Sequence, residues 1–281
     1  MSLEFRNYSG LLAFGSLAFE IFKNMKTSPF PSVFSLKGEL ALITGGGTGI
    51  GQAMAQAMHA AGARVVLVGR REVELAAAVK TMGAGASYAV HDITKTDETA
   101  ALVEMITREH GPVTCLVNNA GRHLKKAAVD TTPQEFLDVL NTHIIGAHEL
   151  TRLVAPGMTE RKHGTILFTA SMASLFGIPL VVAYASAKSA MLGMVRTLST
   201  ELSPHGVRVN AIAPGWIDTD MSRKAFAGDP ARRSKIISRT PMAKLGDVSD
   251  VGWAAVYLSS PAAKFVTGAV LPIDGGVSMG F

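Results

Sequence analysis

Short apolar runs alternate with longer amphipathic segments from Leu36 to the end of the chain, and this order constrains the fold more than any other feature. The apolar runs predict strands over Glu39–Thr44, Arg64–Gly69, Ala86–Val90, Val113–Val117, Thr165–Ala170, Val207–Ile212 and Ala269–Ile273. The amphipathic segments predict helices over Gly49–Ala61, Arg71–Met82, Lys95–His110, Pro133–Met158, Ala183–Ser203 and Ser249–Ser259. Repeated strand–helix–strand order requires right-handed crossovers between parallel strands. We therefore predict a single α/β domain, in which a doubly wound, seven-stranded parallel sheet carries helices on both faces and binds ligands beyond the carboxyl ends of its strands.

The first 35 residues do not follow this alternation, and we predict an N-terminal extension, residues 1–35, ahead of a domain of residues 36–281. Leu11–Phe22 is apolar but too short for a transmembrane helix, so no membrane association is expected. A signal peptide is one interpretation, but the preceding residues lack a clear basic region and no clear cleavage site follows. We favour an extension or artefact ahead of a natural start near Met25.

The composition excludes several classes of protein. Nearly half of the 281 residues are hydrophobic and 17% are charged, so a sizeable core is expected rather than disorder. Cys115 is the only cysteine, which excludes an intrachain disulfide and a multi-cysteine zinc site and favours a cytoplasmic location. The formal charge of +5 suits an anionic cofactor, an acidic substrate or nucleic acid, although a plain surface excess is the commoner cause. No zinc-finger spacing or aromatic-basic RNA motif is present, so we expect no nucleic-acid partner and no bound metal.

A glycine-rich stretch, Thr44–Gly51, lies between the first predicted strand and the first predicted helix. It fits the spacing G-x-x-x-G-x-G, and its candidate cofactor contacts are Gly45, Thr48, Gly49, Ile50 and Gly51. Such a loop makes a tight turn, lets the backbone approach a pyrophosphate and presents the N–H groups of a helix N-terminus to it. An ordinary glycine-rich turn is the alternative, but the strand–loop–helix context favours a dinucleotide-binding loop.

The end of the second predicted strand bears on the choice of cofactor. An acidic residue there would select NAD(H) through the adenosine ribose hydroxyls, but the strand ends with Arg70 and Arg71 and no carboxylate. The guanidinium of Arg70 suits the 2′-phosphate of NADP(H), which we favour over NAD(H), while a solvated arginine pair is the plain alternative. Asp92 and Ile93 follow the third strand, where they are candidates for contacts with the adenine or belong to a simple strand-end turn.

Three residues carry the candidate chemistry. Tyr184 and Lys188 are four residues apart on a predicted helix and share a face, and Ser171 follows the preceding strand. Free tyrosine has a pKa of about 10, and we expect the Lys188 ammonium to lower it by about one to three pH units. Tyr184 would then exchange a proton with a carbonyl or alcohol oxygen that Ser171 holds, while hydride moves to or from nicotinamide. The expected partner is therefore a small-molecule carbonyl compound or alcohol.

Together these motifs resemble the short-chain dehydrogenase/reductase family, from about Leu36 to the C-terminus. The resemblance rests on the glycine loop, the three catalytic candidates, Asn210 and the segments Asn118–Gly121, Pro214–Thr219 and Asp274–Gly276. It implies a Rossmann-type fold and a homotetramer. It also implies that the adenosine part of the cofactor is lined by Asn118, Ala120 and Gly121. Lys188 is expected from the resemblance to hydrogen-bond the nicotinamide ribose. The nicotinamide and pyrophosphate are expected to be held by Pro214, Gly215, Ile217 and Thr219.

One position departs from the family pattern Val-x-Asn-x-x-Gly in the long helix. With Gly146 as the glycine, His143 stands at the asparagine position, and Asn141 lies two residues too early. The resemblance implies that this asparagine holds a water that joins the lysine to a proton relay. Because imidazole has a pKa near neutrality, we predict that His143 holds the water or relays protons itself, and that activity survives. A tolerated substitution with lower turnover is the alternative.

Two substrate classes fit the sequence. Residues 219–240 are expected to form a flap over the site, and its basic residues are Arg223, Lys224, Arg232, Arg233, Lys235 and Arg239. A basic flap favours an anionic substrate, and a solvated helix face explains the same residues. The segment 239–246 is similar to gluconate 5-dehydrogenase-type sugar-acid enzymes, which we favour, and to 3-oxoacyl carrier-protein reductases. A catalytically weak, cofactor-binding regulator is an alternative of another class, and His143 is the only feature that encourages it.

Overall fold

The computed structural model describes residues 32–220, 222–223 and 230–279. Its strands are β1 (Leu40–Thr44), β2 (Arg64–Gly69), β3 (Ala86–Val90), β4 (Cys115–Asn118), β5 (Gly164–Thr169), β6 (Val207–Pro214) and β7 (Val270–Ile273). They form one sheet in the order β3-β2-β1-β4-β5-β6-β7, and all neighbouring strands are parallel. This arrangement confirms the predicted seven-stranded parallel sheet.

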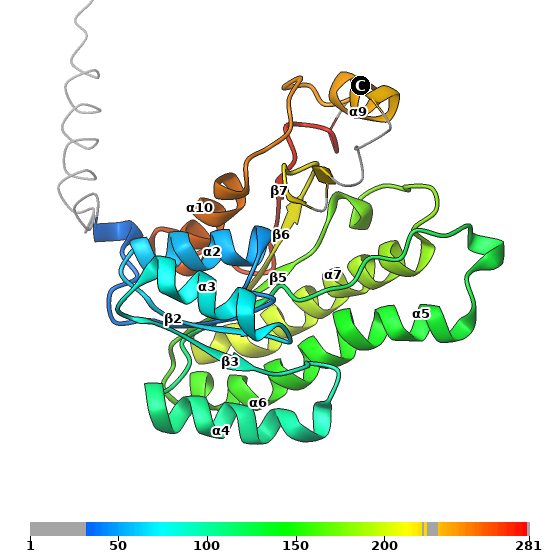
Figure 1. The fold of residues 1–281 in the computed structure, drawn as a ribbon. Coiled ribbons are helices and arrows are strands. Elements are labelled where there is room, and N and C mark those ends of the chain that lie inside the picture. Colours follow the sequence, from blue (N-terminus) through cyan, green and yellow to red (C-terminus); the bar gives the residue numbers. More distant parts are fainter. Residues whose placement is uncertain (1–31, 221, 224–229, 280–281) are drawn as a thin grey trace, which may run out of the picture. The chain divides into compact units, whose positions relative to one another are not determined.

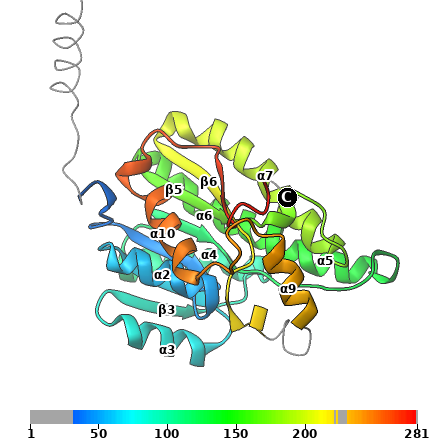
Figure 2. The same cartoon turned by 90° about the horizontal axis from the view of Figure 1, so that it is seen from above.

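Helices cover both faces of the sheet (Figure 1, Figure 2). They are α2 (Gly49–Ala60), α3 (Glu72–Met82), α4 (Thr99–His110), α5 (Pro133–Leu140), α6 (Gly146–Glu160), α7 (Val182–Leu202), α9 (Pro230–Ser238) and α10 (Val248–Ser259). The buried side chains of α2, α3 and α10 share one hydrophobic core with the sheet, and those of α4, α6 and α7 share another. The sheet is therefore doubly wound, as predicted.

Burial on both faces explains why the strands read as continuous apolar runs. All five residues of β1 and all six of β5 are buried. Neighbouring residues of β1 enter opposite cores, since Leu42 packs on the α4, α6 and α7 side and Ile43 on the α2, α3 and α10 side. Such runs are typical of parallel sheets covered by helices, whereas a half-exposed strand would alternate.

The long helix predicted over Pro133–Met158 is present, but a π-helical turn lies inside it. α5 begins with a capping box between Thr132 and Glu135 and ends at Leu140. A π-helical turn, Asn141–Ile145, follows, and α6 begins at Gly146. A Cβ at Gly146 would lie 2.4 Å from the carbonyl oxygen of Ile93, so only glycine permits this close approach. Single π-helical turns inside helices are frequent at functional sites.

The sheet order reverses beside β1, because the chain runs outward from β1 to β3 and then returns to β4 on the other side. Ligands of doubly wound sheets bind at this reversal, at the carboxyl ends of the strands. Thr44 ends β1 and Asn118 ends β4, so the glycine loop and the Asn118–Gly121 segment begin side by side. The fold thus brings two of the sequence motifs together.

Some predicted segments lie outside the described residues. They include nearly all of the extension 1–35 and, in the flap, residues 221 and 224–229 with Lys224, so these remain predictions. The described part of the flap contains α9. Within the described residues, no helix has the length and apolarity needed to cross a membrane.

Candidate active site

The glycine loop after β1 is held in place by Thr44 and Asn119. The Thr44 hydroxyl accepts hydrogen bonds from the backbone N–H groups of Asn119 and Ala120, both at 3.0 Å. The Asn119 side-chain amide donates to the carbonyl oxygen of Thr44 at 3.0 Å and to that of Gly45 at 3.4 Å. The loop after β4 therefore fixes the start of the loop after β1.

The glycines of this loop form a cradle that side chains would fill. A Cβ at Gly51 would lie 2.3 Å from the Gly45 carbonyl oxygen, and a Cβ at Gly45 would lie 3.0 Å from Ala120 Cα. Gly45 and Gly49 have φ values of 67° and 58°, which other residues rarely adopt. Gly49 faces open space, and α2 begins at this residue. This open turn at a helix N-terminus fits the pyrophosphate of a dinucleotide.

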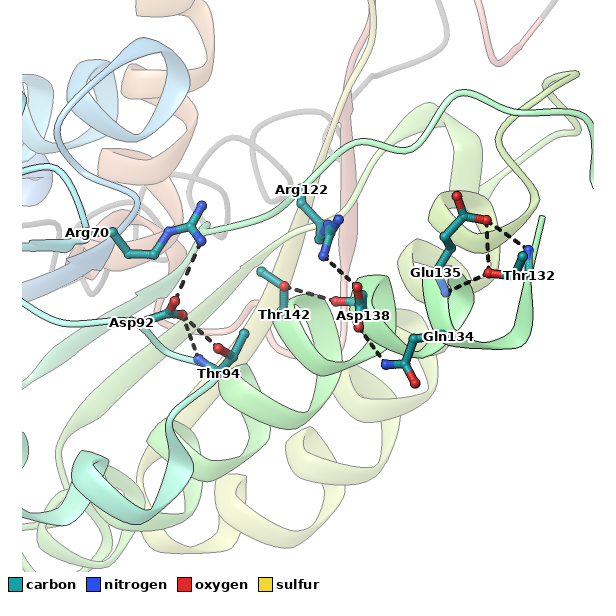
Figure 3. A network of polar contacts seen from close by, with 9 residues as sticks. All are labelled: Arg70, Asp92, Thr94, Arg122, Thr132, Gln134, Glu135, Asp138 and Thr142. Carbon is teal, nitrogen blue, oxygen red and sulfur yellow. Dashed lines mark hydrogen bonds and ion pairs between the residues drawn. The ribbon is translucent and has the colours of Figure 1, made fainter. Parts of the chain in front are cut away.

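Arg70 and Asp92 meet at the ends of β2 and β3, as Figure 3 shows. A guanidinium nitrogen of Arg70 lies 3.5 Å from a carboxylate oxygen of Asp92, and the Arg70 side chain is 72% exposed. Although partial burial opposes the shift, hydrogen bonds from Thr94 and the charge of Arg70 hold the pKa of Asp92 below its usual value. Arg71 donates to the Thr48 hydroxyl at 3.0 Å. Two arginines thus border the glycine loop, and the side chains of both are mostly exposed.

Two further cofactor candidates turn into the protein. Ile93 is 7% exposed and belongs to the core beneath α4 and α6. The Asn118 side chain is buried and donates to the Thr151 hydroxyl of α6 at 3.0 Å, while its Oδ1 has no hydrogen-bond partner. Both side chains are buried, so a contact of either residue with the cofactor would come from its backbone.

Ser171, Tyr184 and Lys188 converge after β5. The Ser171 hydroxyl oxygen accepts the N–H of Ala173 at 3.1 Å and also interacts with the Tyr184 phenol. Lys188 is 3% exposed, donates to the carbonyl oxygen of Thr169, and lies 5.6 Å from the centroid of the Tyr184 ring. The hydroxyl, the phenol and the amine therefore form one contiguous group.

The electrostatics of this group differ from the expectation. Burial raises the pKa of Tyr184, and the hydrogen bond with Ser171 only partly offsets this. Burial also lowers the pKa of Lys188 to about 7. The predicted lowering of the Tyr184 pKa by Lys188 was wrong for this state, because desolvation dominates and the amine itself is easily deprotonated.

The pKa of Lys188 makes stability depend on pH. An exposed lysine has a pKa of about 10.4, so above pH 7 the unfolded chain binds more protons than the folded one, and the free energy of unfolding rises with pH. We expect Lys188→Met to exceed the wild type in stability by about 1–3 kcal/mol at pH 6, and this advantage to shrink by pH 9. Urea denaturation without cofactor measures it, with exposed Lys264→Met as control. A pH-independent difference would contradict the assignment.

His143 lies beneath the site, in the π-helical turn. Its Nε2 is 3.1 Å from the backbone nitrogen of Arg122 and 2.8 Å from the carbonyl oxygen of the same residue. Its ring contacts the Tyr184 ring edge-on, with 5.5 Å between the two ring centroids. A Cβ at Gly121 would lie 2.3 Å from His143 Cε1, so that glycine makes room for the ring. Burial, together with the charge of Lys188, lowers the pKa of His143 to about 3. The expected near-neutral pKa was wrong, and His143 stays uncharged between pH 5 and 8.

The segment after β6 packs against the one after β7. Pro214 ends β6, and a Cβ at Gly215 would lie 2.6 Å from Asp274 Cα, so glycine is required there. Ile217 is buried and pairs with Gly246. The hydroxyl of Thr219 accepts the N–H of Ser222 at 3.1 Å and caps the next turn. These residues reach the same carboxyl edge as Ser171.

One basic residue of the flap is paired with acidic residues. The guanidinium of Arg223 lies 2.8 Å from Asp218 and 2.7 Å from Asp220, whereas Arg233, Lys235 and Arg239 are exposed. The segment after β4 also carries basic residues, and Arg122, His123 and Lys125 are exposed there. The His123 ring lies 5.1 Å from the Tyr184 ring.

The roles of four residues were not predicted from the sequence, namely those of Thr44, Asn119, Arg71 and His123. The asparagine was visible in the Asn118–Gly121 segment, but its bonds to the glycine loop join residues about 75 positions apart. The contact of His123 with Tyr184 joins two loops and leaves no periodic signal in the sequence.

Comparison with known proteins gives one family. A family model described as Enoyl-(Acyl carrier protein) reductase matches residues 45–278. Gluconate 5-dehydrogenase of Gluconobacter oxydans (strain 621H) is 34% identical over 252 residues, which cover 89% of this chain and 98% of that protein. A 3-oxoacyl-acyl-carrier-protein reductase of Vibrio harveyi is 32% identical, and the match covers 87% of this chain and 99% of that protein. The crystal structure of a gluconate 5-dehydrogenase from Burkholderia cenocepacia J2315 in complex with NADP and tartrate has a TM-score of 0.84 at 30% identity, covering 89% of this chain and 99% of that one.

These matches span almost the whole length of each relative, and the likeness of the solved structure covers 89% of this chain. The chain belongs to the short-chain dehydrogenase/reductase family.

Proposed function

We propose that this protein is an NADP(H)-dependent oxidoreductase that interconverts a carbonyl compound and a secondary alcohol. The observation that carries the proposal is the convergence of Ser171, Tyr184 and Lys188 at the same edge of the sheet as the glycine loop. A hydroxyl, a phenol and an amine in contact supply proton transfer and oxyanion stabilisation without a covalent intermediate.

The glycine loop, Arg70 and Lys188 would hold the cofactor. The open turn at Gly49 would take the pyrophosphate, Arg70 the 2′-phosphate, and Lys188 the nicotinamide ribose. Ala120, Gly121, Gly215 and Ile217 would line it. When bound, NADPH supplies the hydride, and NADP⁺ accepts it in the reverse direction.

Tyr184 is the proposed acid in the direction of reduction. Burial keeps its pKa high, so the phenol is protonated at neutral pH and gives its proton to the carbonyl oxygen as negative charge develops there. The Ser171 oxygen accepts the Ala173 N–H, and its proton, which faces the Tyr184 phenol in this structure, would turn to the same substrate oxygen. Lys188, when protonated, stabilises the phenolate that remains.

We propose that His143 is a positioning residue, not a proton carrier. Its neutral ring fixes the backbone of Arg122, and Nδ1, buried and without a partner among the described residues, suits a bound water. His143→Leu should lower kcat about tenfold or more, because the Arg122 backbone loses its partner, whereas His143→Asn should stay within about tenfold of the wild type. Neither should change the shape of the kcat–pH profile between pH 5 and 8. If His143→Asn raised kcat more than tenfold, the imidazole of His143 would reduce turnover rather than support it.

Arg70 is the proposed determinant of cofactor choice. Removing one charge-assisted contact to the 2′-phosphate costs about 1.5–3 kcal/mol, so Arg70→Ala should lower kcat/KM for NADPH about 10–100-fold and leave that for NADH within about threefold. Arg108→Ala, an exposed arginine on α4 whose neighbour Glu109 pairs with it, is the control. A wild-type preference for NADH in steady-state assays would refute the assignment.

The favoured substrate is a sugar acid, by likeness to the gluconate 5-dehydrogenases, and a 3-oxoacyl thioester is the alternative. The test is absorbance of the reduced nicotinamide with gluconate, 5-ketogluconate, polyols and acetoacetyl thioesters. We expect turnover of the 5-ketogluconate and gluconate pair. Cofactor binding without turnover of any of these compounds would instead favour the alternative function, a catalytically weak, cofactor-binding regulator.

A homotetramer and a cytoplasmic location complete the proposal. Trp253 and Phe265 are largely exposed, and a groove of about 350 Å³ lies between α6 and α7, lined by residues that include His148, Leu198 and Leu202. Subunit contacts would cover such surface. Cys115, the only cysteine, is a buried free thiol, which suits a reducing compartment.

A further inference from the structure

The segment Arg122–Lys126 is held at both ends, with His123 between the two anchors. At one end, the His143 ring contacts the backbone of Arg122. At the other, the N–H of Lys126 donates to the carbonyl oxygen of Leu180 at 2.8 Å. Leu180 has a φ of 68°, an unfavourable conformation for a bulky residue, and such strain concentrates where structure is fixed for function. His123 therefore projects from a segment that its surroundings position.

Two imidazoles contact the Tyr184 ring, and they differ in exposure. His143 is buried, whereas His123 is exposed and its ring is tilted by 51° to that of Tyr184. A substrate whose oxygen reaches the phenol of Tyr184 therefore comes within reach of the exposed imidazole.

The segment is rich in basic residues. Four of its five residues are basic, namely Arg122, His123, Lys125 and Lys126. Asp138 pairs with Arg122 at 3.2 Å (Figure 3), and Glu135 pairs with Lys126 at 3.0 Å. Among the described residues, Lys125 has no acidic partner within 4.0 Å. Burial is the main cause of the lowered pKa of His143, and His123 and Arg122 add to it, so their field reaches the buried ring that contacts Tyr184.

We propose that His123 is a specificity-determining residue that binds the carboxylate of a small anionic substrate while the reacting oxygen lies at Tyr184. The inference rests on the proposed function and names the substrate class of the same site. The imidazole donates a hydrogen bond to the carboxylate, and Lys125 adds positive charge at the entrance. Selection for an acid thus comes from the segment after β4, while Arg223 of the flap is paired with Asp218 and Asp220.

The test compares acids with their amides, which differ only in charge. The enzyme–NADP⁺ complex is titrated by calorimetry with gluconate and gluconamide, and with 3-hydroxybutyrate and 3-hydroxybutyramide, and oxidation of each is followed in parallel. We expect the wild type to bind at least one acid about tenfold or more tightly than its amide. His123→Gln, which keeps a donor but cannot be charged, should lower this preference at least fivefold and leave the Kd of NADPH unchanged.

His205→Gln is the matched control, because His205 is exposed and precedes β6 at the opposite edge of the sheet. It should retain the full preference for the acid. Equal affinity for acid and amide in both pairs, or an unchanged preference in His123→Gln, would overturn the proposal. Acid-selective binding that depends on His123, without turnover of any alcohol, would uphold the proposal and remove the oxidoreductase function. Turnover of an alcohol without a preference for the acid would uphold the oxidoreductase function and overturn the proposal for His123.

Discussion

Tyr184→Phe should lower kcat by about 10²- to 10⁴-fold, the contribution typical of a positioned general acid. The change removes one oxygen and keeps the ring between His123 and His143, so the fold and the contacts of Lys188 should persist. Stopped-flow measurement of NADPH oxidation gives the rate of the chemical step, and quenching of protein fluorescence gives the Kd of NADPH.

Tyr257→Phe on α10 is the control for loss of a phenol, and it should keep wild-type kcat. The Kd of NADPH should change less than about tenfold in Tyr184→Phe. A variant that retained more than a tenth of the wild-type rate would show that another group protonates the substrate.

Gly51→Ala should abolish cofactor binding, with a Kd for NADPH at least about 100-fold weaker. The added Cβ would lie 2.3 Å from the Gly45 carbonyl oxygen and 2.5 Å from the Asn119 amide, and both atoms belong to the network that shapes the loop. Relief requires the loop or Asn119 to move, which removes the open turn at the N-terminus of α2. Titration calorimetry with NADPH measures the loss.

Gly193→Ala is the matched control, because its Cβ meets no atom within 4 Å and α7 gains helix propensity. It should bind NADPH normally and unfold at the same or a higher temperature. If Gly51→Ala bound NADPH within about threefold of the wild type, the loop would not be the pyrophosphate site.

The sheet was predictable from the sequence because its signals are local. The central strands are short buried runs, such as Leu40–Thr44, and helix ends are marked by local signals, such as the capping box of Thr132 and Glu135. The spacing of Tyr184 and Lys188 is also local, since four residues along a helix define one face.

What the sequence did not predict depends on contacts between distant segments. The π-helical turn that carries His143 follows from packing around Gly146 and Ile93, which are far apart in the chain. The pKa values of Tyr184 and His143 were mispredicted for one physical reason. Sequence spacing reports which groups are neighbours, but it does not report how completely burial removes water from them.

The central claim is that this chain transfers hydride between NADPH and a carbonyl compound with Tyr184 as the acid. The most direct measurement uses NADPH deuterated at nicotinamide C4 with 5-ketogluconate and an acetoacetyl thioester, and mass spectrometry of the alcohols formed. We predict one deuterium per alcohol product with the wild type, and labelling at least about 100-fold slower with Tyr184→Phe. Tight NADPH binding with no deuterium in any product, or equal labelling by both proteins, would contradict the account.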